Sequence, residues 1–94
     1  MTKTELCKKI SEQTGCDEKE VLAIVECFMM KVKEALINDK NVYLRGFGSF
    51  IIKRRAEKLA RNISKNTAVI IPAHNIPAFK PAKEFVNQTS KLEE

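Results

Sequence analysis

The sequence lacks tryptophan and has only three glycines, three prolines and one histidine in 94 residues. It also lacks a run of about eighteen apolar residues, the length needed to cross a bilayer, and it does not begin with the apolar stretch of a signal peptide. We therefore expect a cytoplasmic protein that does not contact membranes. Hydrophobic residues at 44% and charged residues at 31% predict a folded globular chain.

Cysteine and histidine are too few and too scattered to indicate a metal or catalytic site. Cys7, Cys16 and Cys27 are odd in number and show no CxxC spacing, so we expect reduced thiols. Cys7 and Cys27 fall on or beside helical apolar stripes, which predicts small buried side chains. His74 has no ligand or triad spacing. The sequence therefore predicts a protein that is not an enzyme and holds no cofactor or metal.

Positive charge is abundant but unevenly distributed. Residues 1–40 carry 7 basic and 8 acidic side chains, a net charge of −1, whereas residues 41–94 carry 10 and 4, a net charge of +6. Within residues 53–65 there are six cations and a single carboxylate, Glu57. Such a local excess favours a polyanionic partner. The six cations are Lys53, Arg54, Arg55, Lys58, Arg61 and Lys65.

Two helices are predicted in the N-terminal part of the chain. A capping-box pattern that begins at Thr2 and a stop signal at Gly15 predict a helix over about residues 2–14. A second capping pattern at Asp17 precedes a long apolar stripe, which carries the second helix to about residue 38.

The rest of the chain predicts an antiparallel sheet and a short final helix. Alternating apolar residues predict strands at 42–45 and 50–52, joined by a tight turn at Gly46 and Gly48, and residues 67–71 predict a returning strand. Pro72 and Pro77 have no backbone N–H to donate to a neighbouring strand, so the returning strand is an edge strand or is kinked before Phe79. Pro81 is expected in the first turn of the final helix, at about residues 83–91.

The strand that passes Lys53 has no core to rest on. Neither of its faces continues an apolar row beyond that residue, so it must leave the body of the protein. Together with the returning strand it forms a long protruding hairpin, the arm, at about residues 53–74. The prediction is a single α+β domain over residues 1–94, with two N-terminal helices, a three-stranded antiparallel sheet, the arm and a short C-terminal helix.

Three phenylalanines, Phe47, Phe50 and Phe79, have little chain left to cover them in so small a body. A twin subunit would cover them, which predicts a dimer with these residues in its core. The alternative is that they close the core of a monomer.

Four short motifs are the most distinctive part of the sequence: GFGSF at residues 46–50, Arg61 with Asn62, VIIP at 69–72 and IPAFK at 76–80. With the helix lengths and the position of the arm, they resemble the HU/IHF family of bacterial histone-like proteins over essentially the whole chain. The resemblance implies an intertwined homodimer or heterodimer of the nucleoid, whose arms grip the minor groove of duplex DNA, bend it and compact it.

The resemblance and the charge pattern assign a role to individual residues. Arg61 is the candidate for insertion into the minor groove, beside Asn62, and Lys80 and Lys83 would hold the DNA backbone against the body. The remaining arm cations, Lys53, Arg54, Arg55, Lys58 and Lys65, would neutralise phosphates.

The tip of the arm departs from the family pattern, which has glycine, proline and glycine where this chain has Ala60, Ile63 and Asn66. The proline of relatives inserts between base pairs and kinks the duplex. Ile63 is apolar and belongs to a known type of wedge residue, so we expect it to replace the proline, although it could instead pack against Leu59 or another chain.

Other binding functions remain open at this stage. The same basic arm could bind structured RNA, because phosphate neutralisation does not distinguish the two polymers. A site-specific IHF-like bending factor would have the same overall pattern, and a partner-binding dimer would use the helices alone.

Overall fold

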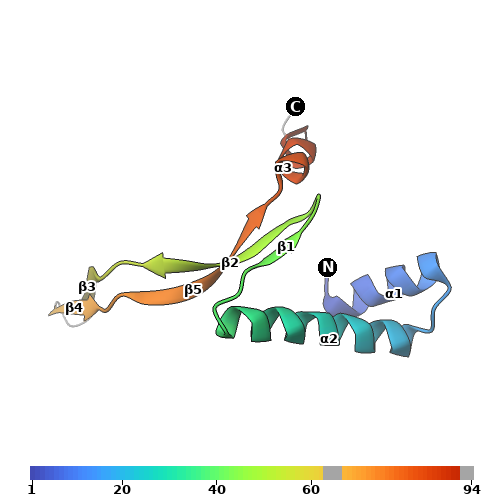
Figure 1. Cartoon of the computed structure of the whole chain (residues 1–94), viewed down its shortest axis with the longest axis horizontal. Helices are drawn as coiled ribbons and strands as arrows, with labels where there is room; N and C mark the ends of the chain where they lie inside the picture. The colour runs from blue at the N-terminus through green and yellow to red at the C-terminus, as the bar shows by residue number, and fades with distance from the viewer. Residues whose placement is uncertain (63–66, 92–94) are drawn as a thin grey trace. The chain divides into compact units, whose positions relative to one another are not determined.

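The computed structural model describes residues 1–62 and 67–91. The element order confirms the predicted α+β class (Figure 1). The chain divides into two compact units, Met1–Ala35 and Leu36–Glu94, which are described in turn. No helix within the described ranges is long and apolar enough to cross a membrane. The elements are α1 (Lys3–Thr14), α2 (Glu18–Ile37), β1 (Val42–Leu44), β2 (Gly48–Arg55), β3 (Lys58–Asn62), β4 (Thr67–Ile71), β5 (His74–Pro81) and α3 (Lys83–Ser90).

In the first unit, the ends of α1 are set by the two residues that predicted them. The side chain of Thr2 accepts a hydrogen bond from the backbone N–H of Glu5 at 3.2 Å, which satisfies a free donor of the first turn. Gly15 adopts a left-handed conformation with φ of 78°, and its N–H donates to the carbonyl of Ser11. Both predicted helix limits are therefore confirmed at α1.

The first unit has a very small core of its own. Cys7 and Val21 are the buried hydrophobic residues of the described chain, and an ion pair of 2.9 Å between Lys3 and Glu26 links α1 to α2. The expectation that Cys27 would be buried is wrong, since this side chain is exposed. It lies three residues after Ile24, about 60° away around the helix, at an edge of the apolar stripe where Ile24 itself is 66% exposed.

The second unit contains the predicted three-stranded antiparallel sheet, with strand order β1-β2-β5. Strand β5 is an edge strand, and its register with β2 continues through Pro77, which pairs with Ile52. The edge-strand alternative is therefore confirmed for Pro77, because an edge strand needs no donor on its outer side, whereas Pro72 lies between β4 and β5.

The two glycines that follow β1 have different roles. Gly46 has φ of 81° at the third position of the turn in which the N–H of Phe47 donates to the carbonyl of Leu44. The placement of Gly48 in this turn is wrong, because Gly48 is buried and is the first residue of β2. A Cβ atom built on Gly48 would lie 2.6 Å from Cζ of Phe79, so the ring of Phe79 can pack this closely only because residue 48 has no side chain.

The final helix, α3, begins at Lys83, as predicted, but Pro81 does not belong to it. Pro81 is the last residue of β5, paired with Gly48, so its assignment to the first helical turn is wrong. Ala82 has extended dihedral angles, and its N–H donates to the carbonyl of Phe47 at 2.9 Å, so the helix begins only after it.

Four phenylalanines form one cluster in the second unit. Phe79 lies between Phe47 and Phe50, with ring centroids 5.1 and 5.0 Å away, and Phe85 of α3 stacks on Phe47 at 5.6 Å. Even so, Phe47 remains 45% exposed and Phe79 39% exposed in the single chain. The aromatic residues thus pack against one another but do not close a core.

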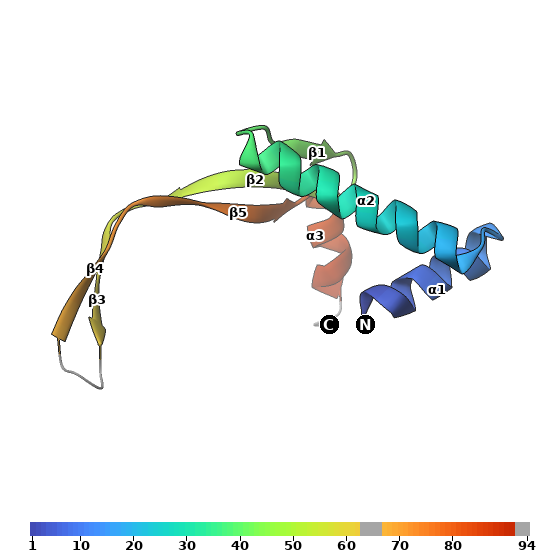
Figure 2. The ribbon, with the colours of Figure 1, turned by 90° about the horizontal axis from the view of Figure 1, so that it is seen from below.

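Beyond the three-stranded sheet, β3 and β4 form a separate two-stranded antiparallel sheet. The last pair of the first sheet is Arg55 with His74, and the first pair of the second is Lys58 with Ile71. Two residues on each strand separate these pairs, and the register is the same on both sides of the break. Figures 1 and 2 show the hairpin continuing past this interruption.

Candidate nucleic-acid interface

The cations predicted to bind a polyanion are displayed along the arm. Lys53, Arg54 and Arg55 occupy the last three positions of β2, and Lys58 and Arg61 lie on β3. All five side chains are exposed. Strands β2 and β3 therefore display these five cations in a fixed order along the length of the arm.

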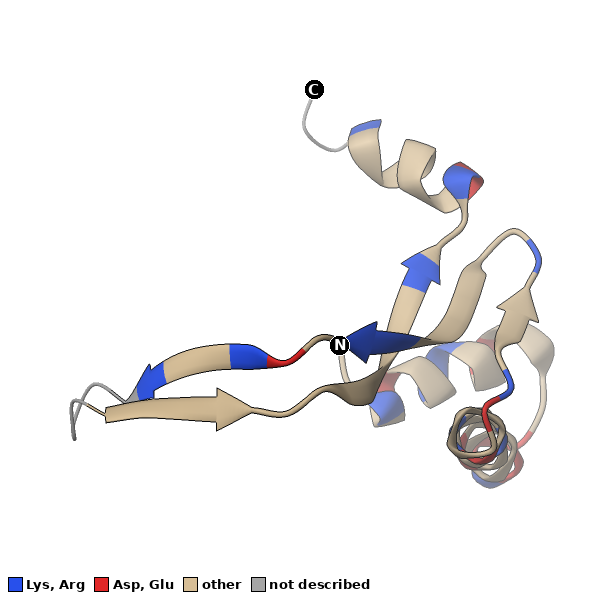
Figure 3. Ribbon diagram, turned by 60° about the vertical axis from the view of Figure 1, so that its left-hand side comes forward, with Lys and Arg blue, Asp and Glu red and all other residues tan. Residues whose placement is uncertain are grey.

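The returning strands carry no compensating negative charge. Neither β4 nor β5 contains an aspartate or glutamate, and the residues that pair with the arm cations are uncharged or, in one case, His74. Figure 3 shows basic segments on β2 and β3 and none on β4. In the part of the chain that the structure describes, the two ion pairs lie on the N-terminal helices, Lys3 with Glu26 and Lys31 with Glu34. The arm cations are therefore available to an external anion.

Alternation along β2 and β5 gives the sheet two different faces. Phe50 and Phe79 pair directly on one face, where the aromatic cluster lies. The other face carries cations at both ends, with an apolar pair between them. From the body outward it carries the pairs Ser49–Lys80, Ile51–Ala78, Lys53–Ile76 and Arg55–His74.

Further out, cations occupy both faces of the ribbon. Arg54 alternates with Lys53 and Arg55, and Lys58 and Arg61 fall on opposite faces of β3. A narrow groove between two phosphate chains presents negative charge on both sides of whatever enters it. A ribbon charged on both faces matches that geometry better than a flat surface would.

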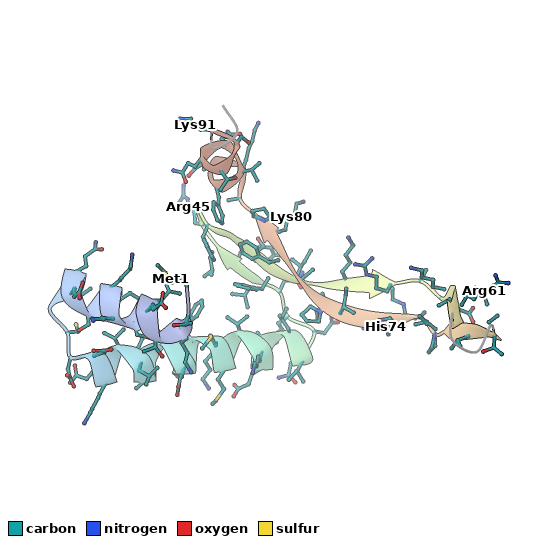
Figure 4. All side chains as sticks on the ribbon, turned by 180° about the vertical axis from the view of Figure 1, so that it is seen from behind. Met1, Arg45, Arg61, His74, Lys80 and Lys91 are labelled. Carbon is teal, nitrogen blue, oxygen red and sulfur yellow. The ribbon has the colours of Figure 1, made fainter. Side chains whose placement is uncertain are left out.

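A second basic region lies where the sheet meets α3. An open groove of about 730 Å³ there is lined by Arg45, Lys80 and Lys83, together with Ser49 and Tyr43. Figure 4 shows Arg45 and Lys80 at this end of the sheet, with His74 further along and Arg61 at the far end. Lys80 and Lys83 were predicted from the sequence but Arg45 was not, because an isolated arginine before a glycine turn gives no signal until the fold places it beside them.

Three comparisons with known proteins agree with this geometry. A family model described as bacterial DNA-binding protein matches residues 1–90. The chain is 35% identical over 91 residues to DNA-binding protein HU of Thermus thermophilus, covering 97% of this chain and 94% of that protein. It is 37% identical over 91 residues to integration host factor subunit beta of Marinobacter nauticus, covering 96% and 93%. An Anabaena HU–DNA cocrystal structure matches with a TM-score of 0.91 and 31% identity, covering 96% of this chain and 98% of that one.

The chain belongs to the HU/IHF family of bacterial DNA-binding proteins. The recognition made from the four sequence motifs is thereby confirmed. In this HU/IHF chain, GFGSF forms the turn and the start of β2, VIIP covers the end of β4 and IPAFK lies on β5.

Not all of the predicted DNA-contacting residues can be placed. Asn62 is the last residue of β3, and its backbone pairs with that of Thr67. Ile63 and Lys65 lie outside the described residues, so their assigned roles stay predictions.

Proposed function

We propose that this HU/IHF chain is an architectural, non-catalytic DNA-binding protein of the nucleoid that grips the minor groove of duplex DNA with its arm and bends and compacts it. The observation that carries the proposal is the exposed row of cations on β2 and β3, which faces returning strands without a single carboxylate. The Anabaena relative was crystallised with DNA, which supports the same partner. The residues proposed to contact DNA are Lys53, Arg54, Arg55, Lys58, Arg61, Asn62, Ile63, Lys65, Lys80 and Lys83.

The sheet face opposite the aromatic cluster offers the DNA a path with cations at both ends. Lys80 lies at its start beside the groove near α3, and Lys53 and Arg55 follow beyond the apolar pair of Ile51 and Ala78. At about 3.4 Å per residue, the six steps from Ser49 to Arg55 span about 20 Å, enough to follow several phosphates. We assign Arg45 to the start of this path, because it lines the same groove as Lys80.

The binding unit is a dimer, either of two identical chains or with a related subunit. The dimer is supported by the large apolar surface that a single chain exposes to solvent. This surface includes Phe47 and Phe79 of the aromatic cluster and Ile24 and Phe28 of α2. Burying such surface against a second chain is the usual way for a small domain to gain a sufficient core. The two compact units would then belong to one dimeric domain, with two arms reaching the same duplex.

Competition binding tests this function. Duplex DNA, duplex RNA and single strands of one length are compared at a single salt concentration, and the affinity for duplex DNA is then followed from 50 to 200 mM salt. If the dimer neutralises six to ten phosphates, affinity for DNA falls about a thousandfold to a hundred-thousandfold over that range. A flat salt response or a preference for RNA would reject the proposal.

Charge reversal in the arm separates DNA binding from assembly. Replacing Arg54 and Arg55 with glutamate should abolish DNA binding and leave the dimer intact, because both side chains are exposed and face no acidic partner. Sedimentation measures the dimer in the same samples. Loss of the dimer in this variant would place the arm in the subunit interface instead.

A further inference from the structure

An exposed apolar pair lies in the outer part of the arm, among the cations. Leu59 on β3 pairs directly with Ile70 on β4, and the two side chains are 70% and 64% exposed. Directly opposed residues of an antiparallel ladder have their Cβ atoms about 5 Å apart, so the two side chains form a single patch.

Among the described residues of the arm, none covers this patch. Strands β3 and β4 form a sheet of only two strands, and an isolated hairpin of that kind gains little stability from a solvated apolar face. Val69, which packs on the opposite face of the same hairpin, is 46% exposed and gives Leu59 and Ile70 no cover. Two large apolar side chains at these positions therefore point to a ligand that covers them.

The surroundings of the patch restrict the chemistry of that ligand. Arg61 and Ala68 share the face of Leu59 and Ile70, and Lys58 precedes the patch on β3. The ligand must combine phosphate charge with apolar surface at a spacing of a few ångströms. Deoxyribose beside a phosphate has this combination, because its C2′ carries only hydrogen. In an RNA helix the minor groove displays 2′-hydroxyl groups instead.

We propose that the Leu59–Ile70 pair packs against deoxyribose in the minor groove and makes the arm prefer DNA over RNA. The inference rests on the proposed function and adds a basis for choosing between the two polymers. Phosphate contacts from Lys58 and the other arm cations serve both polymers equally. A 2′-hydroxyl held against Leu59 and Ile70 loses hydrogen bonds to water without gaining new ones, which penalises RNA.

The test compares the affinities of matched duplex DNA and duplex RNA at a low salt concentration at which both bind. The main variant combines Leu59→Thr with Ile70→Thr, which places β-branched residues at both strand positions and replaces apolar surface by hydroxyl groups. Ile37→Thr is the matched control, because Ile37 is 81% exposed and lies at the end of α2, outside the arm. Arg61→Gln is the second control, since it removes a charge from the same face.

The double variant should lose about tenfold in DNA affinity and less than about twofold in RNA affinity, with an unchanged salt slope. Arg61→Gln should weaken both polymers and reduce the slope, and Ile37→Thr should change neither affinity. Circular dichroism and the dimer mass confirm that each variant is folded. An unchanged ratio of DNA to RNA affinity in the double variant would overturn the inference. Failure of the unaltered protein to bind duplex DNA would instead reject the proposed function.

Discussion

The ring of Phe79 lies against the backbone of Gly48, so closely that a Cβ atom on Gly48 would be 2.6 Å from Cζ and 2.7 Å from Cε1 of that ring. The same Cβ would lie 2.7 Å from the carbonyl oxygen of Lys80, which is backbone and cannot rotate away. This contact joins the start of β2 to the aromatic cluster. The cluster in turn holds α3 through Phe47 and Phe85, so several elements depend on the absence of one methyl group.

Gly48→Ala should therefore destabilise the protein by about 1–3 kcal/mol, the usual cost of overpacking a close contact. Chemical denaturation of the dimer at fixed protein concentration measures the change. Gly15→Ala is a useful comparison, because no atom lies within 4 Å of a Cβ there and its cost comes from φ of 78° alone. Equal stability of Gly48→Ala and the unaltered protein would contradict the packing described above.

Phe79→Ala should weaken the dimer as well as the fold. Its ring contacts Phe47 and Phe50 within one chain, and its exposed 39% is available to a second chain. Because dissociation is coupled to unfolding, the melting temperature of the variant should depend more steeply on protein concentration than that of the unaltered protein. A melting temperature independent of concentration in both proteins would indicate that the aromatic cluster closes a monomeric core.

Neutralising Arg54 should change the salt dependence of DNA binding in a predictable way. Arg54→Gln removes one proposed phosphate contact from each arm, so a dimer with two arms should lose about 1.8 from the slope of log affinity against log salt. Lys31→Gln is the control, because Lys31 lies on α2 and pairs with Glu34. A slope that changes equally in the two variants would show that the effect reflects total charge and not the arm.

Ile63→Ala should reduce the bend of the DNA while leaving most of the affinity. An apolar wedge unstacks a base step, whereas alanine is too small to fill the opened space. Energy transfer between dyes at the two ends of a duplex reports the bend angle, and Ser64→Ala next to it serves as the control. An unchanged bend angle in Ile63→Ala would assign the bending to phosphate contacts alone.

Local signals in the sequence predict much of this fold correctly. Thr2 and Gly15 limit α1 because capping and left-handed termination depend only on neighbouring residues. The arm follows from the missing apolar rows after Lys53, which is also a local property. The predictions failed where contacts between residues distant in the sequence determine the local structure. Pro81 extends β5 because it pairs with Gly48, thirty-three positions earlier in the chain, and Ala82 is held by the carbonyl of Phe47.

In the candidate interface, too, residues close together in the sequence could be predicted and residues brought together by the fold could not. Charge counting located the arm cations, because they are close together in the sequence. Arg45 could not be found in that way, since its neighbours in the groove, Lys80 on β5 and Lys83 on α3, lie far from it in the sequence. The division of β2 into an aromatic and a cationic face also required the observed register with β5.

The break between the two sheets has one further consequence. Ala56 and Glu57 on the outgoing side are matched by Pro72 and Ala73 on the returning side, so the two strands of the hairpin resume pairing in step. Removing a single residue from one side would turn every outer side chain on that strand to the other face, whereas removing two from each side would shorten the arm and preserve both the pairing between its strands and the face on which each outer side chain lies. The reach of this protein over its ligand can therefore be changed by inserting or deleting two residues on each side, without redesigning the surface that makes contact.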